Sequence, residues 1–122
     1  RGAKGAPPSA NRYPGHPAGL VLIGTSHPRD ISLVDERFPI LQILATRDPI
    51  ASIARADRNR RNLPAQTTRI VIAGGNHSQF GDYGFQPDDF VASIPQAGQR
   101  QLTRDAVLAA MTLPNDRNQQ HE

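Results

Sequence analysis

The residues of this chain best suited to chemistry are a histidine and an aspartate that each follow a run of apolar residues. The stretch RIVIAGGNHSQFGDYG, residues 69–84, places His77 in a glycine-rich loop just beyond such a run. The stretch ILQILATRDP, residues 40–49, places Asp48 just beyond another. A carboxylate bonded to one imidazole nitrogen fixes the tautomer of the ring and leaves the other nitrogen free to act as a base. The two residues are therefore a candidate acid–base pair.

Three apolar runs predict the strands that must position this pair. They cover residues 20–25, 40–46 and 69–74. Each run is short and continuous and ends at glycine or polar residues, which is typical of strands buried on both faces of a parallel sheet. Residues 26–39 are expected to form a connection.

The first helix is expected within DPIASIARADRNRRNLP, residues 48–64. Asp48 is a suitable N-cap, Pro49 suits the first helical position, and Pro64 follows the end. Three apolar residues are expected on its buried face, and two basic residues should point away from the core: Ile50, Ile53 and Ala54, and Arg55 and Arg58, respectively.

The last helix is expected over about residues 96–112. One apolar stripe carries Leu102, Ala106, Ala109 and Leu113. Three further apolar residues widen this stripe, namely Val107, Leu108 and Met111, and this predicts burial on more than one side.

The order strand, helix, strand, helix indicates an α/β fold. The second and third strands are joined through a helix, so they should lie parallel with a right-handed crossover. Asp48 and His77 then emerge at the carboxyl edge of one sheet, where open α/β sheets place their ligands. Because neighbouring strands lie about 4.8 Å apart, side chains from adjacent strand ends can touch.

Composition excludes several classes of function. The chain has 122 residues, a formal charge of +3 and no cysteine, so a disulfide framework or a thiolate metal site cannot form. No apolar run reaches the roughly 18 residues that a membrane span needs. The four histidines, His16, His27, His77 and His121, show no metal-ligand spacing. No metal, cofactor or membrane partner is therefore expected. The glycines of the histidine loop match no phosphate-binding motif.

The chain resembles the C-terminal half of an α/β-hydrolase, in the branch similar to dienelactone hydrolase. The resemblance runs from about Gly19 to Leu113 through the strands GLVLIGTS and ILQILATRD and the loop GGNHSQFGDYGFQPDD, of which the loop is the most specific. It implies that Asp48 is the acid and His77 the base of a catalytic triad. In this superfamily the triad runs Ser, acid, His along the chain, and these two residues obey that order.

The nucleophile of the triad is missing from the sequence. The superfamily places its serine in a Gly-x-Ser-x-Gly elbow between a strand and a helix, and no such string occurs here. The nearest string, GTSHP at residues 24–28, lacks the second glycine, so Ser26 is a poor candidate. By the resemblance, the elbow and the oxyanion-hole loop would lie upstream of Arg1.

Structural alternatives exist for each of these residues. His77 could bond only its own turn, and Asp48 could act only as a helix cap, a role that does not exclude catalysis. Asp30 and Asp35 follow the earlier strand and are alternative acids. Four polar residues are expected to brace the histidine loop: Asn76, Gln79, Tyr83 and Gln86.

We therefore expect a partial α/β-hydrolase fold of about three parallel strands with flanking helices. Residues 1–18 are expected to be irregular, 19–113 to form the domain, and 114–122 to be a polar tail. The expected function is the acid-and-base half of a serine hydrolase for ester, lactone or related acyl substrates, inactive alone.

Two other functions remain open at the level of sequence. The first is a non-catalytic binding or interaction module with a truncated α/β fold. The second is a nucleic-acid binder that uses Arg55, Arg58, Arg60 and Arg61, although this run has no aromatic residue for base stacking. A small parallel sheet also has outer edges, through which copies of the chain could associate.

Overall fold

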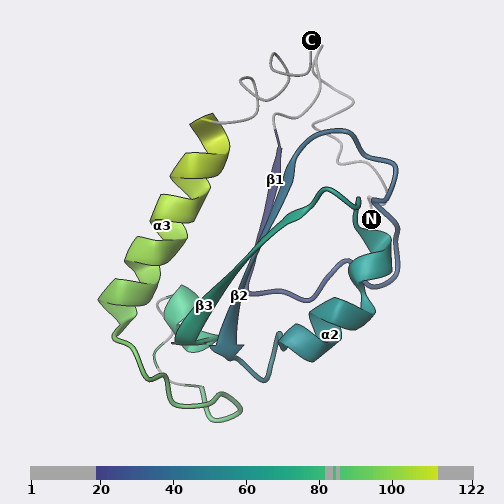
Figure 1. The fold of residues 1–122 in the computed structure, drawn as a ribbon. Helices are drawn as coiled ribbons and strands as arrows, with labels where there is room; N and C mark the ends of the chain where they lie inside the picture. Colours follow the sequence, from purple (N-terminus) through teal and green to yellow (C-terminus); the bar gives the residue numbers. More distant parts are fainter. Residues whose placement is uncertain (1–18, 82–83, 85, 113–122) are drawn as a thin grey trace.

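The computed structural model describes residues 19–81, 84 and 86–112 (Figure 1). The described elements, in chain order, are β1 (Leu20–Ile23), β2 (Ile40–Arg47), α2 (Ile53–Arg58), the 3-10 turn η1 (Arg60–Asn62), β3 (Thr68–Asn76), the 3-10 turn η2 (Ser78–Phe80) and α3 (Gln96–Thr112). The N-terminal segment 1–18, Tyr83, Leu113 and the tail 114–122 lie outside the described residues, as do His16 and His121.

The three strands form one sheet in the order β1-β2-β3, and both neighbouring pairs are parallel. The predicted α/β fold with about three parallel strands is therefore confirmed. β2 is the central strand, and its residues from Ile40 to Ala45 are all buried. This explains why β2 is a continuous apolar run with one interruption, Gln42.

Figure 1 shows α3 and α2 on opposite sides of the sheet. On the α3 side, Leu41, Ile43 and Ile72 form the buried core cluster. The apolar residues packed against it are Ile70, Phe80, Ile94, Ala106, Val107 and Ala110.

A polar chain of contacts joins the sheet to α2. The Arg69 side chain donates from Nε to Oε1 of the buried Gln42 at 2.9 Å and pairs with Asp57 of α2. Gln42 is the polar residue that interrupts the apolar run of β2. Its burial is therefore tied to the docking of α2.

The first helix begins later than the sequence predicts. The Oδ1 atom of Asp48 accepts the N–H groups of Ile50 and Ala51 at 2.9 and 2.8 Å, and this closes a turn rather than a helix. α2 starts at Ile53, after Ser52, whose hydroxyl caps it by accepting the Arg55 N–H. The later start shifts the buried face: Ala54 is exposed, and Ala56 is the buried residue of α2.

The bounds of α3 agree with the predicted helix, and its buried face agrees only in part. Leu102, Leu108 and Met111 are 48%, 52% and 70% exposed, and Ala109 is exposed as well. Contact with the sheet is made by Ala106 and Val107, as predicted, and by Ala110 and the buried Gln99, which the predicted face does not include. The helix is rotated about its axis relative to the predicted orientation, because the Gln99 side chain faces the end of β3 and bonds the backbone of Asn76.

The pairing of β2 with β3 is irregular near their carboxyl ends. Ala45 is opposite Ile72, but Arg47 is opposite Asn76, so two steps along β2 match four along β3. Gly74, with a φ of +83°, adopts a backbone conformation that a side chain would strain. Its N–H donates to Oγ1 of Thr46 at 2.8 Å. The irregularity brings the residues that follow, Asp48 and His77, to the same level of the sheet.

The outer edge of β3 is covered at its carboxyl end. The Gly74 carbonyl accepts the Ser93 N–H at 2.8 Å. Gln99 donates from Nε2 to the Asn76 carbonyl at 2.8 Å and accepts the Asn76 N–H through Oε1 at 3.1 Å, as a neighbouring strand would. Within the described residues, the outer edge of β1 has no strand beside it.

Neither described helix has both the length and the apolar character that crossing a membrane requires.

Candidate active site

Asp48 and His77, one residue beyond the ends of β2 and β3, are in direct contact. The Oδ2 atom of Asp48 lies 3.0 Å from Nδ1 of His77. This is the length of a good hydrogen bond. The contact joins residues 29 positions apart in the chain. The parallel sheet brings them together because Arg47 and Asn76, the residues just before them, are partners across the sheet after the irregular step.

The carboxylate of Asp48 is fixed from two sides. Its side chain is 0% exposed, whereas that of His77 is 22% exposed. Oδ1 holds the turn of residues 48–51 through two backbone N–H groups, and Oδ2 faces the imidazole. A buried carboxylate needs such partners, because an unpaired buried charge is costly. The helix-cap role and the contact with His77 therefore use different oxygens of one group.

This contact selects a tautomer for His77. An ionised carboxylate only accepts hydrogen bonds, so Nδ1 must carry the proton of the neutral ring. Nε2 is then unprotonated and can accept a proton from another group. A carboxylate beside Nδ1 also stabilises the imidazolium formed when Nε2 takes that proton. The pair has the arrangement of a general base with its orienting acid.

Asp89 fixes the backbone on which His77 stands. Its Oδ1 accepts the N–H groups of His77 and Phe90 at 3.3 and 2.9 Å. Its Oδ2 accepts the N–H and the hydroxyl of Ser78 at 2.7 and 2.6 Å. Burial raises the pKa of Asp89, but the hydrogen bonds donated by Ser78, His77 and Phe90 outweigh burial and leave the pKa below its usual value. Asp89 is thus a charged anchor for His77 and the 3-10 turn η2 that follows it, together called the histidine turn.

Amide side chains brace the other side of this turn. Asn76 Oδ1 accepts the Gln79 N–H at 3.0 Å, and Asn76 Nδ2 donates to the Phe90 carbonyl at 2.8 Å. The Gln79 side chain donates to Oε1 of Gln99 at 2.8 Å. The structure places Asn76 and Gln79 where the sequence predicts them, as braces. Gln86 takes part through its backbone N–H, which donates to the Ser78 hydroxyl at 3.1 Å.

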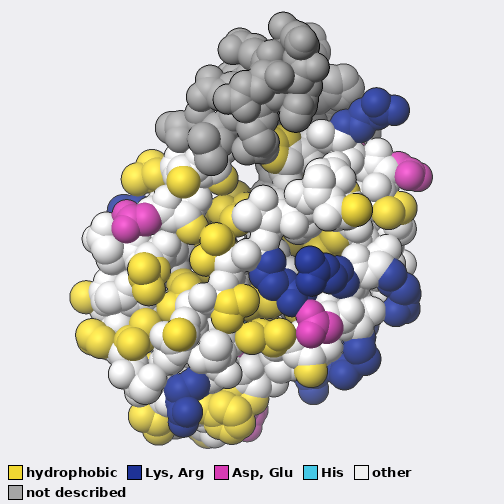
Figure 2. Space-filling model, viewed as in Figure 1, with side chains coloured by type: hydrophobic (Ala, Val, Ile, Leu, Met, Phe, Trp, Pro, Cys, Tyr) yellow, Lys and Arg dark blue, Asp and Glu magenta, His cyan; other side chains and the backbone are white. Residues whose placement is uncertain are grey.

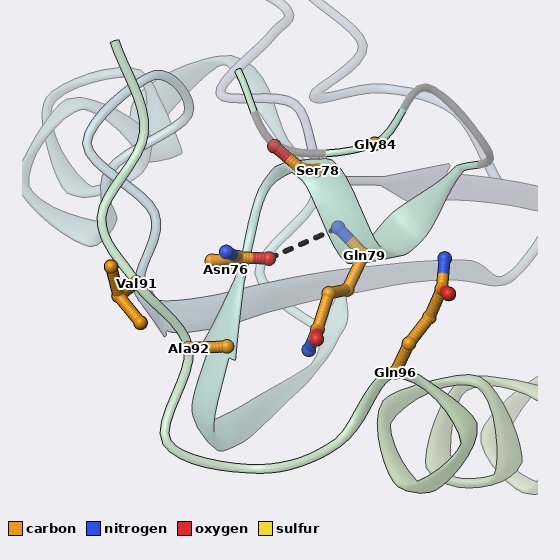
Figure 3. Close-up of a pocket in the computed structure, with 7 residues that line it drawn as sticks. All are labelled: Asn76, Ser78, Gln79, Gly84, Val91, Ala92 and Gln96. Carbon is orange, nitrogen blue, oxygen red and sulfur yellow. Dashed lines mark hydrogen bonds between the residues drawn. The ribbon is translucent and has the colours of Figure 1, made fainter. Parts of the chain in front are cut away.

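A hollow of about 260 Å³ lies beside these braces. Figure 3 shows the residues that line it. The residues that line it come from the end of β3, the turn after it, the segment that follows and α3: Asn76, Ser78, Gln79, Gly84, Val91, Ala92 and Gln96. The dashed line in Figure 3 is the bond from the Gln79 N–H to Asn76. His77 is not among the lining residues, so this hollow is not the space next to the imidazole.

The alternative acids and the alternative nucleophile take other positions. Asp30 is exposed and lies 3.7 Å from the Arg29 guanidinium, and Asp35 is exposed too. Asp48 is the acid that contacts His77. Ser26 lines a different hollow, next to α2, and its carbonyl accepts a bond from Asn59.

Two residues that support the site have no role in the sequence-based expectation. Asp89 belongs to the Gln-Pro-Asp tail of the histidine loop, but nothing in its spacing shows that it anchors His77. Gln99 lies in a predicted helix, three residues before Leu102 of the predicted apolar stripe, and this place on the helix is the one signal that could have marked it. Groups of three or more His, Asp or Glu side chains that could hold a metal ion do not occur among the described residues.

Comparison with known proteins identifies the family. No curated protein and no solved structure matches the chain. A family model described as the alpha/beta hydrolase family matches residues 11–101, which is most of the chain. This range contains all three strands and both members of the Asp48–His77 pair. The chain therefore belongs to the alpha/beta hydrolase family, and its family is one of hydrolases.

Proposed function

We propose that this chain supplies the acid, Asp48, and the base, His77, of a serine hydrolase that acts on esters, lactones or related acyl compounds. The observation that carries the proposal is the 3.0 Å contact between Asp48 Oδ2 and His77 Nδ1 at the carboxyl edge of a parallel sheet. Family membership supports a hydrolase. The string GGNHSQFGDYGFQPDD, which resembles dienelactone hydrolases, supports that branch.

In the proposed reaction, His77 acts in two steps, acylation of a serine and then hydrolysis of the acyl-serine. In the first step Nε2 takes the proton of a serine hydroxyl as that oxygen attacks the acyl carbon, and the same nitrogen then returns the proton to the leaving group. In the second step Nε2 takes a proton from the attacking water and returns it to the serine oxygen, which releases the acid product. Asp48 stabilises the imidazolium between the two proton transfers of each step. General-base action of this kind contributes about 10²–10⁴-fold to the rate.

The nucleophile would come from a segment outside these 122 residues, because the sequence contains no Gly-x-Ser-x-Gly. The chain alone should therefore form no acyl-enzyme. Incubation with a fluorophosphonate probe, followed by mass spectrometry of the intact chain, should show no added mass. Covalent labelling of Ser26 or any other serine of this chain would contradict the division of the triad.

The roles of Asp48 and His77 can be tested in a protein that joins a Gly-x-Ser-x-Gly segment ahead of this chain. His77→Ala should lower kcat/KM by about 10²–10⁴-fold with an unchanged far-UV circular dichroism spectrum. Asp48→Asn should also lower kcat/KM, because an amide can donate to Nδ1 and favour the wrong tautomer. Asp30→Asn, at an exposed acid, is the matched control and should leave kcat/KM unchanged. Unchanged turnover in His77→Ala would remove His77 from the mechanism.

A non-catalytic binding module is the second candidate, and the missing elbow is the observation that favours it. Under this alternative, Asp48 and His77 only hold the two strand ends together. Substitution of either would then alter thermal stability, but the joined protein would show no esterase activity with p-nitrophenyl acetate. Turnover that depends on His77 would exclude this alternative.

A further inference from the structure

A second hollow, on the α2 side of the molecule, is lined by basic side chains. Its volume is about 440 Å³. The loop after β1 contributes one wall, with Ser26, His27 and Arg29, and the segment from the β2 end through α2 contributes the other, with Ile50, Arg55, Arg58 and Asn59. Three arginines are among the lining residues, and no aspartate or glutamate is.

The three arginines differ in the partners that their guanidinium groups already have. Arg29 lies 3.7 Å from Asp30, but both side chains are largely exposed, so this pair is weak. Arg55 donates from one terminal nitrogen to the Ile50 carbonyl at 3.2 Å, a neutral acceptor that orients the guanidinium without neutralising it. The guanidinium of Arg58 has no partner among the residues that the structure describes. The hollow therefore keeps a net positive charge.

The walls of this hollow are tied together by two asparagines. Asn59 donates from Nδ2 to the Ser26 carbonyl at 2.8 Å, and Asn62 donates to the Pro28 carbonyl at 2.9 Å. The Leu33 N–H completes the connection by donating to the Asn62 carbonyl at 2.7 Å. The loop after β1 and the α2 segment thus form one supported unit, so the three arginines line one hollow whose two walls are joined by hydrogen bonds.

We infer that this hollow binds a small dianion of the phosphate type. Several guanidinium groups around one space suit a group with several oxygens and two negative charges, because each guanidinium can donate two bonds to paired oxygens. Figure 2 shows basic side chains gathered over the α2 side of the molecule, whereas the α3 side is mainly hydrophobic. Binding at this hollow does not depend on the catalytic role proposed for His77.

Inorganic phosphate is the probe, and backbone amide chemical shifts of the whole chain are the readout. Titration at constant ionic strength should give saturable shifts confined to residues 26–29 and 50–59. Arg58→Gln and Arg55→Gln should each weaken phosphate binding by about tenfold or more, the effect of one lost hydrogen bond to a charged group. Arg60→Gln removes the same charge from an exposed residue outside the lining, so its affinity for phosphate should change less than twofold.

Parallel titrations with succinate and with a single-stranded oligonucleotide separate the alternatives. Succinate should bind at the same residues, but more weakly, because its two carboxylates are further apart than the oxygens of phosphate. The inference is overturned if Arg60→Gln weakens phosphate binding as much as Arg58→Gln does, or if the shifts do not saturate. Tight oligonucleotide binding that all four variants Arg55→Gln, Arg58→Gln, Arg60→Gln and Arg61→Gln weaken equally would also overturn it, in favour of a nucleic-acid surface.

Discussion

At the scale of single residues, the site depends on carboxylates that each satisfy several donors. Asp48 divides its two oxygens between the turn of residues 48–51 and His77. Asp89 accepts four bonds from the histidine turn and the residue after itself. The imidazole is therefore fixed twice, through its ring by Asp48 and through its backbone by Asp89. Such double support is what the role proposed for His77 requires, because a general base must be held in one geometry.

The anchoring by Asp89 predicts a dependence of stability on pH. The pKa of Asp89 is lowered in the folded chain, so its contribution is fully present above the unfolded value of about 3.9 and is lost as the pH falls through the folded value. Asp89→Asn should lower the free energy of unfolding by about 1–3 kcal/mol near pH 7. The difference from wild type should shrink below about pH 4, as the native Asp89 becomes protonated.

Urea unfolding at a series of pH values measures this difference. Asp88→Asn is the matched control, since Asp88 is the exposed neighbour and its substitution removes the same charge. Its free energy of unfolding should stay within about 0.5 kcal/mol of wild type. An equal loss in both variants would show that net charge, rather than the bonds of Asp89, causes the effect.

The contact between Asp48 and His77 could be expected from the sequence because chain order and strand direction place both residues at the carboxyl edge of one sheet. The irregular pairing that brings them to the same level could not be expected. Two acid candidates, Asp30 and Asp35, could be set aside only with coordinates, since all three acids follow apolar strands. The anchors Asp89 and Gln99 could not be predicted. Their partners include backbone groups 11 to 23 residues away, and no local pattern encodes such distant bonds.

At the scale of elements, glycines permit the end of β3 to adopt its irregular path. A Cβ added at Gly75 would lie 2.6 Å from Oε1 of the Gln99 side chain. That contact is too short, so Gln99 would have to leave Asn76. Because Gly75 has no side chain, the buried Gln99 of α3 can pack directly on β3.

Gly75→Ala should destabilise the chain by about 1–3 kcal/mol, because it overpacks this site and displaces the buried Gln99. Gly98→Ala is the matched control. An added Cβ there has its nearest neighbour at 3.8 Å, and alanine is the better helix former. It should raise stability by up to about 1 kcal/mol. Thermal unfolding followed by circular dichroism compares the two, and equal melting temperatures would contradict the close approach of α3 to β3.

The helices show where sequence patterns fail at this scale. The last helix has the predicted bounds, but Leu102, Leu108 and Met111 are exposed because Gln99 sets its rotation. The first helix starts at Ile53 because Ser52 caps it, although Asp48 followed by proline is also a good start signal. Helix-capping propensity alone does not decide between Asp48 and Ser52, because both residue types are good caps. In the structure Asp48 closes a separate turn and contacts His77.

At the scale of the whole molecule, a three-stranded sheet leaves outer edges and a small core. The described part of the chain exposes Val21 and Ile23 of β1 at 37% and 40%. The N–H of Leu20 donates to the Pro39 carbonyl, and that of Gly24, just after β1, donates to the Ile43 carbonyl. In a parallel pair, alternate residues of a strand direct their N–H groups toward the same neighbour. The N–H of Val21 therefore faces away from β2. We expect marginal stability or association of copies of the chain through this edge.

Val21→Pro tests the edge, because proline removes an N–H that β2 does not use. Light scattering coupled to size-exclusion chromatography should show a mass that rises with concentration for wild type. The same measurement should give a monomer for Val21→Pro. Val21→Thr, which keeps the N–H, should associate as wild type does. A wild-type chain that is monomeric at all concentrations and melts cooperatively at high temperature would contradict this expectation.

The cover that Ser93 and Gln99 place over the carboxyl end of β3 has a consequence for such an assembly. A sheet whose two outer strands could both pair with another copy would assemble without limit and give fibres. Here Ser93 and Gln99 already bond the backbone groups of β3 at its carboxyl end, so β1 is the edge that remains able to pair with another copy. Growth should stop at a two-fold symmetric dimer, whose self-complementary seam uses up the same strand from each copy.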